Sequence, residues 1–136
     1  MAYGFNEDKS KYNLPKLLWE NPNPSSFPAQ TITLNDDLTN YDFIEIIIVH
    51  STTAFTHVSC KVPVAANQTE LVSTYPYQIG DTNVIYINTR NAQWNANAPT
   101  SITFGDGNRK LINAGNITAM TNTTYAIPVA VIGHKY

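Results

Sequence analysis

The chain is short of charge, of cysteine and of long hydrophobic runs. Of its 136 residues 13% are charged, against roughly 25% in a typical soluble domain. Lysine and arginine total 8 against 10 acidic residues, with no basic cluster, so we expect no nucleic-acid partner. The longest apolar run, residues 46–49, is far below the roughly 20 residues that span a bilayer, so we expect no membrane partner. Residues 1–5 lack the charged start and apolar stretch of a signal peptide.

Residues that carry chemistry are equally scarce. Cys60 is the only cysteine, which excludes an intrachain disulfide, and its alternation with valines predicts a buried thiol rather than a nucleophile. The three histidines, His50, His57 and His134, show no metal-ligand spacing, so we expect no metal and no cofactor. Most acidic residues fall in predicted turns, where calcium binding stays open. We therefore expect no catalytic residue and no enzyme.

Asparagine and threonine, 16 of each, supply the polarity that charge does not. Aromatic residues make up 11% of the chain, and the periodic Ala, Leu, Glu and Lys of amphipathic helices are missing. This composition predicts an all-β protein.

Period-two alternation between turn signals predicts about seven to nine short strands. The expected strands cover residues 16–19, 30–34, 41–51, 57–64, 70–77 with a break at Pro76, 84–90, 102–104, 110–112 and 127–132. Gly105-Asp106-Gly107-Asn108 predicts a hairpin turn, residues 91–99 and 113–124 predict loops, and Pro128 suggests an edge strand or an outward-facing amide position. The spacing favours one antiparallel β-sandwich domain, residues 16–136, of jelly-roll type, preceded by an N-terminal extended arm, residues 1–15.

The predicted strand 41–51 is apolar on both faces. One face carries three isoleucines, and the other carries Phe43, Ile47 and Val49. A sheet has only one core to face, so we predict that this second face or the arm contacts a neighbouring copy. Repeated identical contacts close into symmetric assemblies, and we expect a homo-oligomer, a trimer in the simplest case.

Two segments place aromatic rings beside neutral hydrogen-bonding groups. We take Trp94 as a candidate ligand anchor with Arg90, Gln93 and Asn95 as hydrogen-bonding neighbours, and Tyr75 and Tyr77 as further candidates. Because basic clusters that would grip phosphates are missing, the expected ligand is a neutral cell-wall saccharide. The other interpretation stays open: Trp94 packs on its own core and the tyrosines fill a sheet face.

Three stretches carry a resemblance when taken in order. They are residues 3–11 (YGFNEDKSK), residues 18–31 (LWENPNPSSFPAQT) and residues 38–46 (LTNYDFIEI), and residues 127–133 (IPVAVIG) close the chain in a similar manner. Together they resemble small virion proteins of tailed bacteriophages that infect Gram-positive bacteria. The similarity is loosest between about residues 55 and 125, where loops would decide a ligand.

The resemblance implies a structural virion protein with a β-domain and no active site. Its expected location is the virion, its expected partners are itself and other virion proteins, and a host-adhesion role is possible for such tail-fibre or receptor-binding components. Placement on the head, as capsid decoration or a head fibre, stays open. From another class, a stand-alone carbohydrate-binding module fits the same composition.

Overall fold

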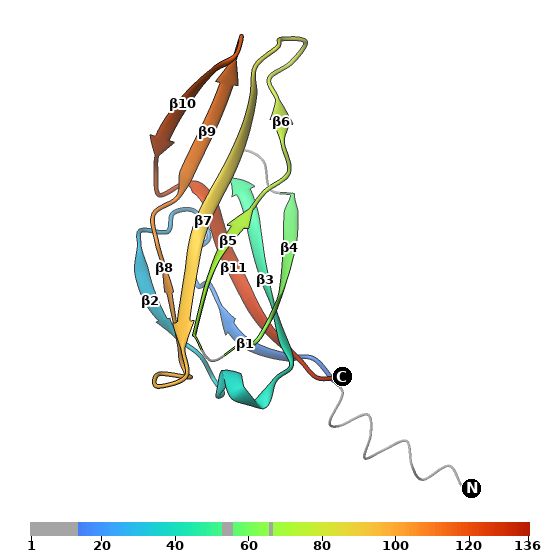
Figure 1. Ribbon diagram of the computed structural model, residues 1–136, viewed down its shortest axis with the longest axis vertical. Coiled ribbons are helices and arrows are strands. Elements are labelled where there is room, and N and C mark those ends of the chain that lie inside the picture. The colour runs from blue at the N-terminus through green and yellow to red at the C-terminus, as the bar shows by residue number, and fades with distance from the viewer. Residues whose placement is uncertain (1–13, 53–55, 66) are drawn as a thin grey trace, which may run out of the picture.

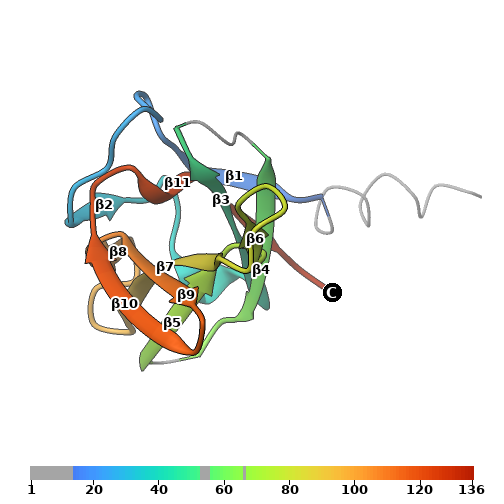
Figure 2. The ribbon, with the colours of Figure 1, turned by 90° about the horizontal axis from the view of Figure 1, so that it is seen from above.

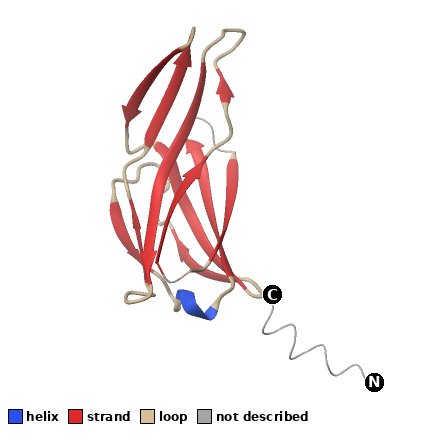
Figure 3. Ribbon diagram, viewed as in Figure 1, coloured by secondary structure: helices blue, strands red, loops and turns tan. Residues whose placement is uncertain are grey.

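The structure is a computed structural model that describes residues 14–52, 56–65 and 67–136. Within these ranges the chain is all-β, and its one short helical turn is the 3₁₀ turn Leu38–Asn40, capped by the Asp37 carboxylate (Figures 1 and 3). The N-terminal arm, except Leu14 and Pro15, lies outside the described residues.

One sheet has four antiparallel strands in the order β1-β11-β3-β4. These are β1 (Lys16–Glu20), β11 (Tyr125–His134), β3 (Phe43–Ser51) and β4 (His57–Pro63). β11 therefore lies between β1 and β3, and an edge position for Pro128 is wrong. The register shifts between Pro128 and Ala130, and a bulge is one of the few interior places where a strand tolerates proline.

The second sheet is organised around the long strand β7 (Ile85–Asn95). On one edge of β7 lie β8 (Ser101–Phe104) and β9 (Asn108–Asn113), and on the other lie β5 (Asn67–Ser73) and β6 (Tyr77–Gln78). β2 (Gln30–Thr33) pairs with β8, and β10 (Asn116–Thr121) pairs with β9. The break between β5 and β6 falls at Pro76, as the sequence predicts.

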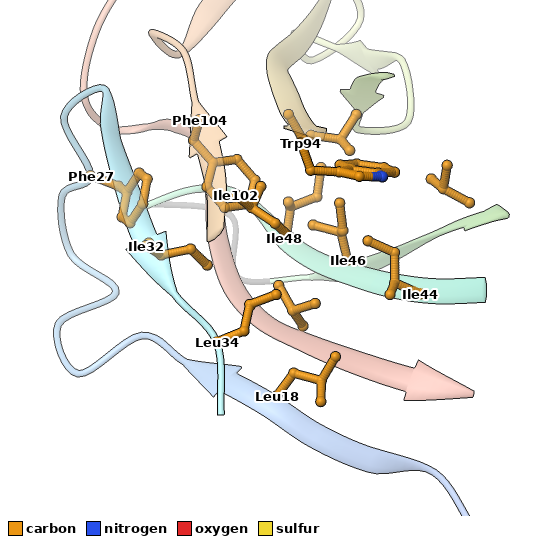
Figure 4. Packing of buried hydrophobic residues seen from close by; sticks show 14 of the residues in the cluster. Leu18, Phe27, Ile32, Leu34, Ile44, Ile46, Ile48, Trp94, Ile102 and Phe104 are labelled. Carbon is orange, nitrogen blue, oxygen red and sulfur yellow. The ribbon is translucent and has the colours of Figure 1, made fainter. Parts of the chain in front are cut away.

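The two antiparallel sheets pack face to face as a β-sandwich, as expected, while jelly-roll connectivity stays a prediction. Figure 4 shows the core between them, where Ile44, Ile46 and Ile48 of β3 meet Trp94, Ile102 and Phe104 of the other sheet. The predicted isoleucine face of β3 is fully buried. Val58, Cys60 and Val62 of β4 face the same core, with Cys60 half-buried.

The sandwich covers only part of β7. In Figure 1 the upper half of β7, with β6, β9 and β10, extends beyond the ends of β3, β4 and β11. At the base of this region the Arg109 guanidinium of β9 lies over the Tyr125 ring of β11, and beyond it all residues of β10 are exposed. This region is a single layer of sheet.

Three predicted connections are wrong. The loop predicted at residues 91–99 begins only after Asn95, because Arg90, Ala92 and Trp94 alternate inward along β7. Residues 105–108 do not turn a hairpin, since β8 and β9 follow the same edge of β7 and Gly105 N–H donates to Asn91 O (2.9 Å). The predicted loop 113–124 contains β10, which reverses from β9 through Ala114 and Gly115 (φ +50° and +81°), the left-handed pair that tight hairpins require.

Gly107 explains why the chain bends between β8 and β9. A Cβ atom there would lie 2.4 Å from Tyr125 O and 2.5 Å from Asn122 O. Only glycine permits this approach, and it lets the chain pass close to the start of β11 without leaving the edge of β7.

Candidate functional site

Trp94, the predicted ligand anchor, lies in the core. Its side chain is 4% exposed and points between the sheets (Figure 4). The indole Nε1 has no hydrogen-bond partner among the described residues. Because β7 continues through residue 95, side chains alternate between its two faces, and Trp94 falls on the face that points into the core. The ligand-anchor hypothesis is therefore wrong.

Arg90 is also structural. Its side chain is fully buried and donates from Nε to Ala126 O (2.9 Å), from Nη1 to Gly105 O (2.6 Å) and from Nη2 to Tyr125 O (2.9 Å). Burial lowers the pKa of Arg90 to about 10, which leaves it charged at neutral pH. The guanidinium ties the end of β8 and the start of β11 to β7, so Arg90 does not serve as a ligand contact.

Gln93 and Asn95 do face solvent. They lie on the outer face of β7, flanked by Thr69 of β5 and by Ser101 and Thr103 of β8. Two shallow hollows, of about 240 and 280 Å³, lie on either side of the strand. This surface offers neutral hydrogen-bonding groups, but the aromatic ring predicted to accompany them is on the other side of the sheet.

Tyr75 and Tyr77 pack around buried His50. The imidazole lies 5.1 Å from the Tyr75 ring and 5.3 Å from the Tyr77 ring, with Tyr86 at 5.1 Å. Burial, with a smaller contribution from the Arg109 charge, lowers the pKa of His50 and favours the neutral imidazole. The tyrosines thus mainly fill the core side of the upper sheet, although Tyr77 stays 38% exposed.

The three candidate interface residues of β3 differ in how exposed their side chains are. Val49 is 4% exposed within this single chain and belongs to the core, so it is not available to a neighbour. Phe43 and Ile47 are half-buried, and the Phe43 ring stacks on His134 with centroids 4.5 Å apart. These two residues remain interface candidates.

Sequence reasoning missed an isoleucine row on the single-layer part of the second sheet. Ile85 of β7, Ile112 of β9 and Ile117 of β10 stand directly opposite one another across the three strands. They are 37%, 36% and 69% exposed. Recognising the row requires knowing that β9 continues along β7 and that residues 116–121 form a strand, and the sequence suggested otherwise on both counts.

Sequence reasoning also missed a hollow beside Trp19. It has a volume of about 330 Å³ and is formed by β1, the following Asn-Pro loop and β2. Its lining includes Trp19, Asn23, Ser26, Gln30 and Thr31. The pairing of an aromatic ring with amides that we predicted around Trp94 thus occurs here.

Across residues 14–52, 56–65 and 67–136, no group of three or more histidine, cysteine or acidic side chains is placed to hold a metal ion. No helix in the described part of the chain has the length and hydrophobicity to cross a membrane. The sequence matches no protein-family model, and no curated protein is significantly similar to it. We therefore infer the function from the surfaces of the molecule described above.

Proposed function

We propose that this chain is a non-enzymatic structural protein of a bacteriophage virion, a β-sandwich that assembles as a homo-oligomer on a tail appendage or on the capsid surface and contributes to host adhesion. The resemblance of residues 3–11, 18–31 and 38–46 to phage virion proteins supports the virion role. The chemistry of the proposed function is non-covalent: self-association, attachment to the particle and contact with the host surface.

The isoleucine row carries the assembly part of this proposal. Three β-branched apolar side chains in register on an uncovered layer of sheet are costly to leave in water. The adjacent edge strand β10 carries no charge and no proline, the features that usually protect a free edge from pairing. A second copy of the chain, brought to this face, buries the row. A contact of the row with the same row of its neighbour closes as a dimer, whereas a contact of the row with a different surface of the next copy closes as a ring, and the proposed trimer requires this second kind of contact.

Low charge supports the same conclusion. A net charge of −2 on 136 residues gives weak repulsion between neighbouring copies. The amide- and hydroxyl-bearing outer face around Gln93 and Asn95 suits the wet, adaptable contacts of a surface protein. The alternative, a stand-alone carbohydrate-binding module, predicts secreted glycosidases encoded nearby, whereas the virion role predicts neighbouring portal, capsid or tape-measure genes.

We expect the wild-type chain to form oligomers at micromolar concentration, and Ile117→Asp, combined with Ile112→Asp, to reduce them to 15.1 kDa monomers in light scattering. The substituted carboxylates would have to lose their hydration in the interface. Thr33→Asp, at an exposed position of β2 on the opposite edge of the same sheet, is the matched control and should leave the oligomer intact. A wild-type protein that stays monomeric at micromolar concentration would contradict the assembly proposal. If Ile47→Asp dissociates the oligomer and the isoleucine-row substitutions do not, the interface lies on β3 and not on the isoleucine row.

A further inference from the structure

The hollow beside Trp19 lies on the open side of the sandwich. β1 is an outer strand of one sheet and β2 of the other, and residues 21–29 connect them (Figure 2). The pairing of β1 with β11 shifts register between Leu17 and Trp19. The bulge buries Leu18 fully and leaves Trp19 half-buried at the rim, with its ring edge-on to Phe27 (5.9 Å, 73°).

The loop that forms the rim is fixed at both ends. Asn21 donates from its backbone N–H to Val129 O (2.8 Å) and from Nδ2 to Pro128 O (2.8 Å). Phe27 is 3% exposed, and its N–H donates to Thr123 O (2.9 Å). A ligand entering the hollow therefore meets a preformed surface and loses little binding energy to ordering it.

None of the described residues that line the hollow has an ionisable side chain. Asn23 Oδ1 accepts from Ser25 Oγ (2.6 Å), which leaves the Asn23 amide hydrogens available. Gln30 Nε2 donates to Pro28 O (3.1 Å), which leaves the Gln30 carbonyl available as an acceptor. A neutral donor and a neutral acceptor beside an aromatic ring match a ligand that carries hydroxyl groups, whereas a phosphate or an ammonium group would find no counter-charge there.

We propose that this hollow binds one ring of a neutral saccharide, with the ring against Trp19 and its hydroxyls on Asn23 and Gln30. The inference rests on the adhesion role proposed above and names its ligand class. A volume of about 330 Å³ is at the small end of ligand sites, which fits one sugar ring rather than a long chain. A single shallow site is weak, with a Kd in the millimolar range, and several copies on one particle supply avidity.

The two tryptophans of the chain make a direct test possible. The full chain is labelled with 5-fluorotryptophan and titrated with glucose, N-acetylglucosamine and rhamnose, and with glycerol phosphate as an anionic probe. We expect at least one neutral sugar to shift the ¹⁹F resonance of Trp19 saturably, while buried Trp94 serves as the internal control and stays unchanged. Trp19→Phe assigns the two resonances in a folded variant.

Asn23→Ala and Gln30→Ala should each weaken sugar binding about fivefold, the value of one hydrogen bond. Asn113→Ala, which removes an exposed amide of β9 outside the hollow, should leave the affinity unchanged. The proposal is overturned if no neutral sugar moves the Trp19 resonance, if glycerol phosphate binds as well as the sugars, or if Asn23→Ala and Gln30→Ala have no effect. The oligomer size of the protein and its presence in the particle are both measured without sugar. A failure of the saccharide proposal can therefore be told apart from a failure of the proposed virion function.

Discussion

Trp94→Ala is expected to destabilise the fold by about 3 to 5 kcal/mol, the range for removing a large buried aromatic side chain. The indole contributes to the core between β7 and β3, and its loss leaves a cavity that the surrounding strands cannot fill. A domain of this size is stable by roughly 5 to 15 kcal/mol, so the variant loses a large share of its stability. Urea unfolding followed by circular dichroism measures the change.

Trp94→Phe provides the matched control. It keeps an aromatic ring in the core and removes the indole N–H, which has no partner among the described residues. We expect this variant to differ from wild type by about 1 kcal/mol or less, because the lost volume and the removed polar group have opposite effects. A Trp94→Ala variant that is as stable as wild type would show that the ring faces solvent.

Arg90→Met is the second substitution with a large expected effect, a loss of about 3 kcal/mol. Methionine occupies a similar volume but leaves the carbonyls of Ala126, Gly105 and Tyr125 buried without their donors. The same substitution removes the link between the end of β8 and the start of β11. Thermal and urea unfolding measure the loss.

Lys110→Met, on exposed β9, removes a positive charge without burying an unpaired carbonyl and should stay within about 0.5 kcal/mol of wild type. Arg90→Lys should recover only part of the loss, since an ammonium does not reproduce the planar fork of the guanidinium. Equal stability of Arg90→Met and wild type would mean that the apolar replacement compensates fully for the broken hydrogen bonds, and the structural role of Arg90 would be wrong.

The all-β class and most strands were predictable because alternation over short segments depends on local sequence alone. Residues 46–49 are an example, since an uninterrupted run of β-branched residues has few alternatives to a buried strand. The break at Pro76 is another, because proline removes a ladder hydrogen bond wherever it stands.

The role of residues 90–95 was not predictable in the same way. Arg90, Ala92 and Trp94 all point inward from β7. In the sequence, however, an arginine and a tryptophan among amides resemble surface residues. The burial of Arg90 is explained only by the three backbone carbonyls, outside β7, that accept hydrogen bonds from its guanidinium. The same applies to Gly105 and Gly107, which favour a hairpin locally. In the structure Gly105 lies against Asn91 of β7, and Gly107 lies against the backbone oxygens of Asn122 and Tyr125, contacts that local sequence does not reveal.

Candidate binding surfaces were the hardest part to predict, because each joins strands that are distant in sequence. The isoleucine row needs β7, β9 and β10 in a particular register, and the Trp19 hollow needs β1 and β2 on the same side of the sandwich. The arrangement that the sequence predicted around Trp94, a ring beside neutral amides, occurs in the structure at Trp19 instead.

Mass spectrometry of purified virions, with and without tails, will show whether this chain is a structural component of a phage particle. We expect the chain to be present at several copies per particle, and its loss with the tails or its retention on the heads will assign its location. Absence of the chain from particles whose major capsid and tail proteins are fully detected would show that it is not a virion component.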